Sequence, residues 1–126
     1  MSQLCDACYA THLLGHWVRE RRALSLERAV HMLTGRTAAL YGIEGRGRLA
    51  EGLPADIVVF DPAKVGAGPL ERVHDLPAGA DRLVSRPSGI AAVLCNGKVL
   101  PPPGEAWPAG DGLPGRLLRG GKRGKA

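Results

Sequence analysis

Residues 56–61 constrain the fold most, because four consecutive apolar residues stand there between two aspartates. The run Ile57 to Phe60 follows Asp56 and ends at Asp61. Short runs of β-branched and aromatic residues bounded by turn residues are typical of buried strands. Because every position of the run is apolar, we expect this strand to be covered on both faces.

The first third of the chain is predicted to be helical. Small and apolar residues recur there at three- and four-residue steps, which places them on one helix face: Leu4, Cys8, Thr11, Leu14 and Val18. Ser25 is a candidate N-cap of a second helix, and Thr34 of a third, shorter one. Gly42 is the expected left-handed residue that ends the third helix.

The second half is predicted to hold short strands among many loops. Ala92 to Cys95 and Lys98 to Leu100 flank Asn96-Gly97, which is the strongest short signal for a hairpin turn. The chain contains 18 Gly and 10 Pro residues, and the excess collects after residue 61. We therefore expect three to five short strands, with an irregular segment over residues 101–115.

The net charge of +5 comes from the C-terminal end. Five basic residues and no acid stand there: Arg116, Arg119, Lys122, Arg123 and Lys125. A Gly-rich basic tail without aromatic residues to stack on bases is typical of a solvated end, so we expect no nucleic-acid partner. No apolar run approaches the length of a membrane helix. The chain has three cysteines, an odd number, and no export signal, which favours reduced thiols in a cytoplasmic protein.

Four patterns suggest chemistry, but none of them predicts a site. One cluster joins Cys5, Cys8, His12 and His16 on a single predicted helix, where four ligands over three turns span too far for one ion. Residues 110–115 match a dinucleotide fingerprint but lack the strand and helix that its mechanism needs. His74-Asp75 could be a catalytic base with its orienting acid, but no nucleophile with supporting spacing is visible. Asp56 and Asp61 are expected to be strand-end caps. We therefore assign no catalytic, cofactor-binding or metal-ligating residue to this chain.

The order and spacing of several segments resemble a known family. These segments are Leu13 to Arg21, Leu26 to Gly42, Gly47 to Asp61, Asp75 to Leu83, Val93 to Gly97 and Leu113 to Arg119. Together they resemble the C-terminal part of an N-acyl-D-amino-acid deacylase (D-aminoacylase), within amidohydrolase family 3. The run from Asp75 to Leu83 points to the deacylase-like branch.

The resemblance implies a division of the chain and a missing catalytic centre. Members of the family fold as a (β/α)₈ barrel with a small β-sandwich, and they hydrolyse amide bonds with zinc-activated water. Residues 1–45 then correspond to the end of the barrel, residues 46–119 to the C-terminal share of the sandwich, and residues 120–126 to a basic disordered tail. The zinc ligands and the catalytic aspartate are expected to precede Met1, so the fold class is α+β in a C-terminal fragment.

The sequence therefore predicts a C-terminal segment of a zinc-dependent amidohydrolase that hydrolyses non-peptide C–N amide bonds only when complete. Its expected partner is the missing barrel portion or a second copy of itself, with no membrane partner. The small-molecule N-acyl amino acid substrate applies only to a complete enzyme. Two alternatives stay open: a stand-alone, non-catalytic β-rich accessory or interaction module, and a small basic nucleic-acid-associated protein.

Overall fold

The structure is a computed structural model that describes residues 8–102, 105–110 and 112–120. It is a mixed α+β chain, as the sequence predicts. It divides into two compact units that are interleaved along the sequence. Unit 1 comprises Met1–Ala29 with Phe60–Ile90, and unit 2 comprises Val30–Val59 with Ala91–Ala126. The predicted division at residues 45/46 concerns correspondence to the family domains, and it stays a prediction.

The first helix is present, but its geometry changes along its length. Helix α1 (Tyr9–His12) continues into the π-helix η1 (Leu13–Glu20). The backbone N–H of Arg21 donates to the carbonyl of His16 at 2.8 Å, a five-residue step that widens the turn. Leu14 is buried, as the predicted face requires, whereas Leu4 lies outside the described residues.

The two following helices confirm most of the predicted boundaries. Helix α2 (Leu26–Leu33) is capped by Ser25, whose Oγ accepts the backbone N–H of Arg28 at 3.2 Å. Helix α3 (Gly35–Leu40) is followed by Tyr41 as C-cap and then by Gly42, which has the predicted left-handed conformation with a φ of 63°. There the N–H of residue 43 donates to the carbonyl of residue 38 at 2.8 Å, which completes the C-cap.

Thr34 stands at the predicted N-cap position of α3 but does not cap that helix with its side chain. Its hydroxyl donates instead to the carbonyl of Val30 at 2.7 Å, in the last turn of α2. A threonine hydroxyl readily satisfies a carbonyl four residues earlier, and this local bond competes with capping the next helix.

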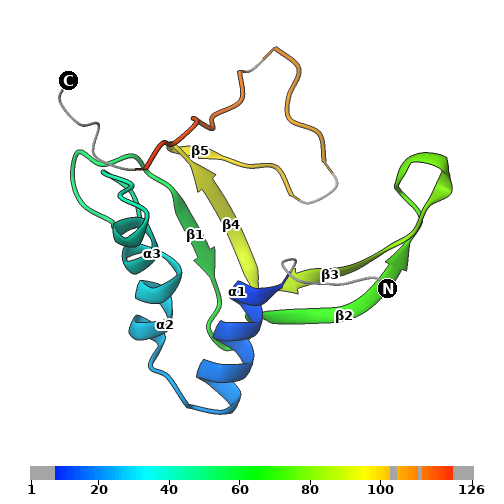
Figure 1. Cartoon of the computed structure of the whole chain (residues 1–126), viewed down its shortest axis with the longest axis horizontal. Helices are drawn as coiled ribbons and strands as arrows, with labels where there is room; N and C mark the ends of the chain where they lie inside the picture. The colour runs from blue at the N-terminus through cyan, green and yellow to red at the C-terminus, as the bar shows by residue number, and fades with distance from the viewer. Residues whose placement is uncertain (1–7, 103–104, 111, 121–126) are drawn as a thin grey trace. The chain divides into compact units, whose positions relative to one another are not determined.

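One sheet contains the predicted strand and the predicted hairpin. Strand β4 (Ile90–Cys95) lies between β1 (Ile57–Phe60) and β5 (Lys98–Val99) (Figure 1). Asn96 and Gly97 form the hairpin turn with φ values of 49° and 83°, as the Asn-Gly signal predicts. The expectation that β1 is covered on both faces is wrong for this chain, because Val58 is 52% and Val59 47% exposed.

A second, two-stranded sheet was not expected from the sequence. Strand β2 (Gly66–Val73) pairs antiparallel with β3 (Arg82–Ser88) in a long hairpin whose tip holds a short 3₁₀ turn, η2 (Pro77–Gly79) (Figure 1). The register shifts between Ala67 and Leu70, and Pro69 lies within this irregularity. A proline can be accommodated at such a bulge because it cannot donate to a regular ladder.

Unit 1 is held together by a close approach between helix and strand. A Cβ on Gly15 would lie 2.7 Å from the carbonyl oxygen of Val65 and 3.0 Å from the Cα of Gly66. The guanidinium of Arg19 donates to the same Val65 carbonyl. Val65 is 1% exposed, so this contact forms the centre of the unit's small core.

Candidate functional site

The cluster of histidines on α1 and η1 is the most chemically distinctive group in the described part of the chain. The rings of His12 and His16 stack with centroids 4.9 Å apart and an interplanar angle of 16°. The His16 ring also meets Trp17 edge-on, and its Nδ1 lies 3.0 Å from Oε2 of Glu20. That hydrogen bond holds the pKa of the Glu20 carboxyl below its ordinary value, and Arg19 lowers it further.

This cluster does not converge on a closed metal centre. Among the residues that the structure describes, no group of three or more His, Cys, Asp or Glu side chains could hold a metal ion. A zinc site uses at least three protein ligands, so the described residues do not fit the zinc centre that the resemblance implies. Cys5, the first member of the predicted cluster, lies outside the described residues.

Asp56 anchors three segments of unit 2 to one another. Its Oδ1 accepts the backbone N–H of Asn96 at 2.8 Å, and its Oδ2 pairs with the guanidinium of Arg46. The bond from Asn96 lowers the pKa of the Asp56 carboxyl below its ordinary value, and Arg46 adds to that effect. Asn96 in turn donates its side-chain amide to the carbonyl of Pro114. These contacts make Asp56 a structural anchor.

Asp61 forms the turn after β1. Its Oδ1 accepts the backbone N–H of Ala63 at 2.8 Å, and its carboxylate lies 3.5 Å from Nζ of Lys64. The interpretation of Asp56 and Asp61 as strand-end caps is therefore confirmed.

His74 and Asp75 engage different partners at the β2–β3 hairpin. Asp75 accepts two hydrogen bonds from Arg82, each 2.7 Å long, whereas Nδ1 of His74 lies 3.4 Å from the carbonyl oxygen of Gly79. Arg82 holds the pKa of the Asp75 carboxyl below its ordinary value, so this carboxylate serves an ion pair across the hairpin.

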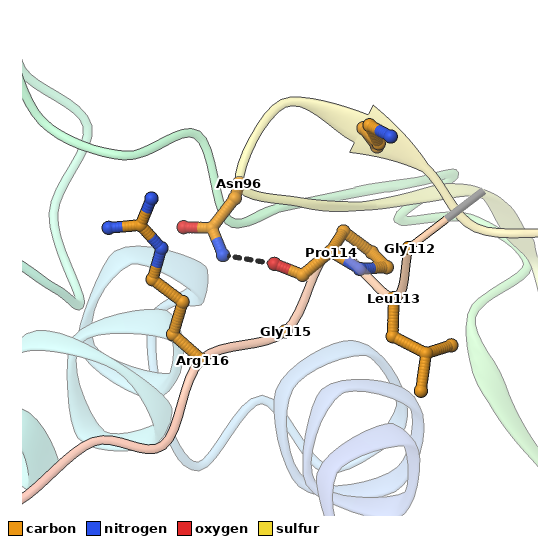
Figure 2. Close-up of a pocket in the computed structure, with 7 residues that line it drawn as sticks. Asn96, Gly112, Leu113, Pro114, Gly115 and Arg116 are labelled. Carbon is orange, nitrogen blue, oxygen red and sulfur yellow. Dashed lines mark hydrogen bonds between the residues drawn. The ribbon is translucent and has the colours of Figure 1, made fainter.

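An open pocket of about 310 Å³ lies beside the Asn96 turn. It is lined by Asn96, Lys98 and residues 112–116 (Figure 2). Figure 2 shows the Asn96 amide directed at the Pro114 carbonyl, while the Leu113 side chain points away from it. Among the described residues, this lining carries two cations, Lys98 and Arg116, and no carboxylate, histidine or cysteine. Residue 111, within the dinucleotide-like run, lies outside the described residues.

Sequence reasoning missed Arg46 and the second role of Asn96. Arg46 stands just before the run from Gly47 to Asp61 and belongs to no local pattern, and its partner Asp56 stands ten residues later. The side chain of Arg46 is only 12% exposed, which a sequence pattern does not reveal for an arginine. Asn96 is recognisable as a turn residue, but its bond to Pro114 depends on a segment far away in the sequence.

The fold and these contacts define a mixed α+β scaffold in which the described polar residues anchor segments to one another. Comparison with known proteins identifies its relatives. The model of the amidohydrolase family matches residues 4–101. The chain therefore belongs to the amidohydrolase family, which confirms the resemblance inferred from the sequence.

Individual relatives are deacylases of N-acylated D-amino acids. The chain is 39% identical over 112 residues to an N-acyl-D-aspartate deacylase of Alcaligenes xylosoxydans xylosoxydans, covering 82% of this chain and 21% of that protein. It is 41% identical over 85 residues to a D-aminoacylase of the same organism, covering 68% and 16%. The chain thus spans between about a sixth and about a fifth of the length of these curated relatives.

A solved structure agrees with this assignment. It is a crystal structure of N-acyl-D-glutamate deacylase from Bordetella bronchiseptica, complexed with zinc and a phosphonate inhibitor that mimics the tetrahedral intermediate. The TM-score is 0.63 at 40% identity, with 86% of this chain and 20% of that chain covered. The described residues include no helix long and apolar enough to cross a membrane.

Proposed function

We propose that this chain is the C-terminal segment of a zinc-dependent amidohydrolase of the N-acyl-D-amino-acid deacylase type. The complete enzyme hydrolyses a non-peptide C–N amide bond of a small N-acyl amino acid, and this segment alone is inactive. The proposal rests on one observation. The chain is about 40% identical to deacylases, but it spans only about a fifth of their length. We place the complete enzyme in the cytoplasm, with neither nucleic acid nor membrane as a partner.

The described residues support a scaffolding role within that enzyme. Asp56, Arg46 and Asn96 hold the segments of unit 2 together, and Gly15 allows the first helix to approach Val65 in unit 1. Since the described side chains do not fit a zinc centre, we derive no catalytic step from this chain. Its proposed partner is the barrel portion of the enzyme, with self-association as the alternative.

An amidase assay tests the inactivity of the isolated chain. We expect no turnover of N-acyl-D-amino acids by the full chain with added Zn²⁺, because a catalytic zinc needs a convergent set of protein ligands. The assay compares the chain with a metal-only blank. It also uses a variant that lacks four side chains: Cys5, Cys8, His12 and His16.

Two outcomes of this assay would contradict the proposal in different ways. Turnover that survives loss of the four side chains would place catalytic residues elsewhere in this chain. Turnover that disappears with them would make the helix cluster a catalytic centre. A complementary observation is the genomic DNA upstream of Met1, where a continuation encoding barrel strands and histidine ligands supports the proposal. An intact promoter there favours the stand-alone module.

A further inference from the structure

The stacked histidines of α1 and η1 have a ring nitrogen free for a ligand. His12 is exposed, and within the described residues neither of its ring nitrogens takes part in a hydrogen bond. His16 is half-buried, and its ring lies parallel to that of His12 with centroids 4.9 Å apart. Two imidazoles therefore stand side by side, one helical turn apart.

The carboxylate of Glu20 fixes the tautomer of His16. An ionised carboxylate only accepts hydrogen bonds, so the 3.0 Å contact requires Nδ1 of His16 to carry the proton. The lone pair of the neutral ring is then on Nε2. Histidines that bind metal ions almost always donate their other ring N–H to a carboxylate, a carbonyl or water in this manner. Glu20 thus supplies the outer partner that such a ligand needs.

We propose that His12 and His16 form a two-imidazole chelate for a divalent transition-metal ion, with Glu20 as the residue that orients His16. Metal–imidazole bonds are about 2.0–2.1 Å long, so two nitrogens on one ion lie at most about 4.2 Å apart. A tilt of the exposed His12 ring toward His16 achieves this, because the terminal torsion of a histidine side chain is broad. Water completes the coordination of the ion.

The surroundings of the pair determine which ions bind. Arg19 lies 3.4 Å from the second oxygen of Glu20, so the local carboxylate charge is shared with a cation. Binding must then come from the strength of the metal–imidazole bonds, and Cu²⁺ forms the strongest of these among the common divalent ions. We expect Cu²⁺ to bind more tightly than Zn²⁺ and Mg²⁺ to have no effect. This proposal does not depend on the activity of the complete enzyme.

Titration of the full chain with Cu²⁺ tests the chelate. Binding is followed by calorimetry and by quenching of Trp17, whose ring meets His16 at 5.2 Å between centroids. A Trp17→Phe variant identifies the quenched fluorophore. We expect one ion per chain, with His12→Gln and His16→Gln each weakening binding by more than about tenfold and Glu20→Gln by about tenfold. Far-UV circular dichroism checks that each variant keeps its helix content.

Matched variants decide whether the site is this pair. The chain has four histidines, so His31→Gln and His74→Gln remove the same side chain elsewhere and should leave affinity within about twofold. A Cys5→Ser/Cys8→Ser variant should behave likewise. Unchanged affinity in the His12→Gln/His16→Gln double variant, equal weakening by His31→Gln, or loss of binding with the two thiols would each overturn the proposal.

Discussion

Asp56 shows how one carboxylate links the run from Gly47 to Asp61 to the Asn96-Gly97 hairpin turn between β4 and β5. Its two oxygens accept from the backbone of Asn96 and from Arg46, and Asn96 reaches onward to Pro114. Removing the Asp56 side chain would therefore loosen the contacts of several segments at once. The aspartate before β1 therefore contributes more to unit 2 than an ordinary turn residue does.

Replacing Asp56 by alanine should loosen the turn at Asn96. We expect the backbone N–H of Asn96 to exchange with solvent roughly fivefold faster. A hydrogen bond to a partly exposed carboxylate stabilises the closed turn by about 1 kcal/mol, and the variant loses this bond. Amide hydrogen exchange followed by NMR measures this. Asp56→Asn keeps an acceptor for Asn96 and should have a smaller effect. Equal exchange in wild type and Asp56→Ala would mean that the carboxylate does not hold the turn.

The same contact should depend on pH in one direction. The bond from Asn96, with the help of Arg46, puts the folded pKa of Asp56 below its ordinary value near 3.8. Because the folded pKa is depressed, the contact contributes its stabilisation above that ordinary value and loses it as the pH falls through the folded pKa. NMR titration of the Asp56 carboxyl should give a midpoint below 3.8, and Arg46→Gln should raise it. A midpoint at or above 3.8 in the wild-type chain would refute the contact.

At the scale of elements, the helix formed by α1 and η1 depends on a glycine. Gly15 lets the helix backbone approach Val65 and Gly66 more closely than any larger residue allows. Arg19, one turn further along, donates to the carbonyl of Val65 and so fixes the same approach. Close backbone approach and one guanidinium thus both contribute to the contact between this helix and the start of β2.

A Gly15→Ala substitution should weaken this contact. The added Cβ would come within 2.7 Å of a backbone oxygen, and overpacking of this kind costs about 1–3 kcal/mol. We expect faster hydrogen exchange across Leu13–Glu20 and unchanged exchange in β4 and β5. Gly112→Ala is the matched control, because nothing lies within 4 Å of a Cβ there. Exchange that rises equally in both variants would mean that Gly15 has no special packing role.

The elements that the sequence predicted are those with local signals. Ser25, Gly42 and the Asn96-Gly97 turn act through contacts within a few residues, so their patterns are readable. Strand β2 lacks such signals, because Gly66, Gly68 and Pro69 favour loops and only pairing with β3 makes this segment a strand. A Cβ on Gly68 would lie 2.5 Å from the carbonyl oxygen of Arg86, so this glycine allows the two strands to approach closely.

The candidate site divides in the same way. Helical spacing placed His12 and His16 on neighbouring turns, and the structure brings them together. Glu20 stands four residues after His16, a spacing that allows the two side chains to meet on a helix. Whether the carboxylate actually contacts the imidazole depends on side-chain rotamers, which the sequence does not reveal. The anchor at Arg46 and the bond from Asn96 to Pro114 depend on tertiary structure, so no sequence pattern revealed them.

At the scale of the whole molecule, the described residues bury little apolar surface. The buried apolar residues are Leu14, Ala29, Ala38 and Val65. Large apolar side chains are exposed in both units, including Val58, Val59, Leu70, Leu113 and Leu117. Exposed apolar surface and strand edges favour association with a partner or aggregation.

The isolated chain should therefore be poorly soluble and only weakly folded. We expect narrow dispersion of backbone NMR signals, and improvement when the chain is co-expressed with the barrel portion of a related deacylase. Co-expression with an unrelated barrel protein is the control. A soluble monomer with a sharp, cooperative melt would favour the stand-alone module instead.

The interleaving of the two units has a consequence for synthesis of the chain. A ribosome that has added the first 59 residues has made one stretch of each unit and completed neither. Unit 1 is complete only after Ile90 has been added, and the ribosome adds about 5–20 residues per second. For a few seconds, therefore, the first helix, formed by α1 and η1, is present without β2 and β3, which belong to the same unit. The apolar face of this helix is available in that interval to a chaperone.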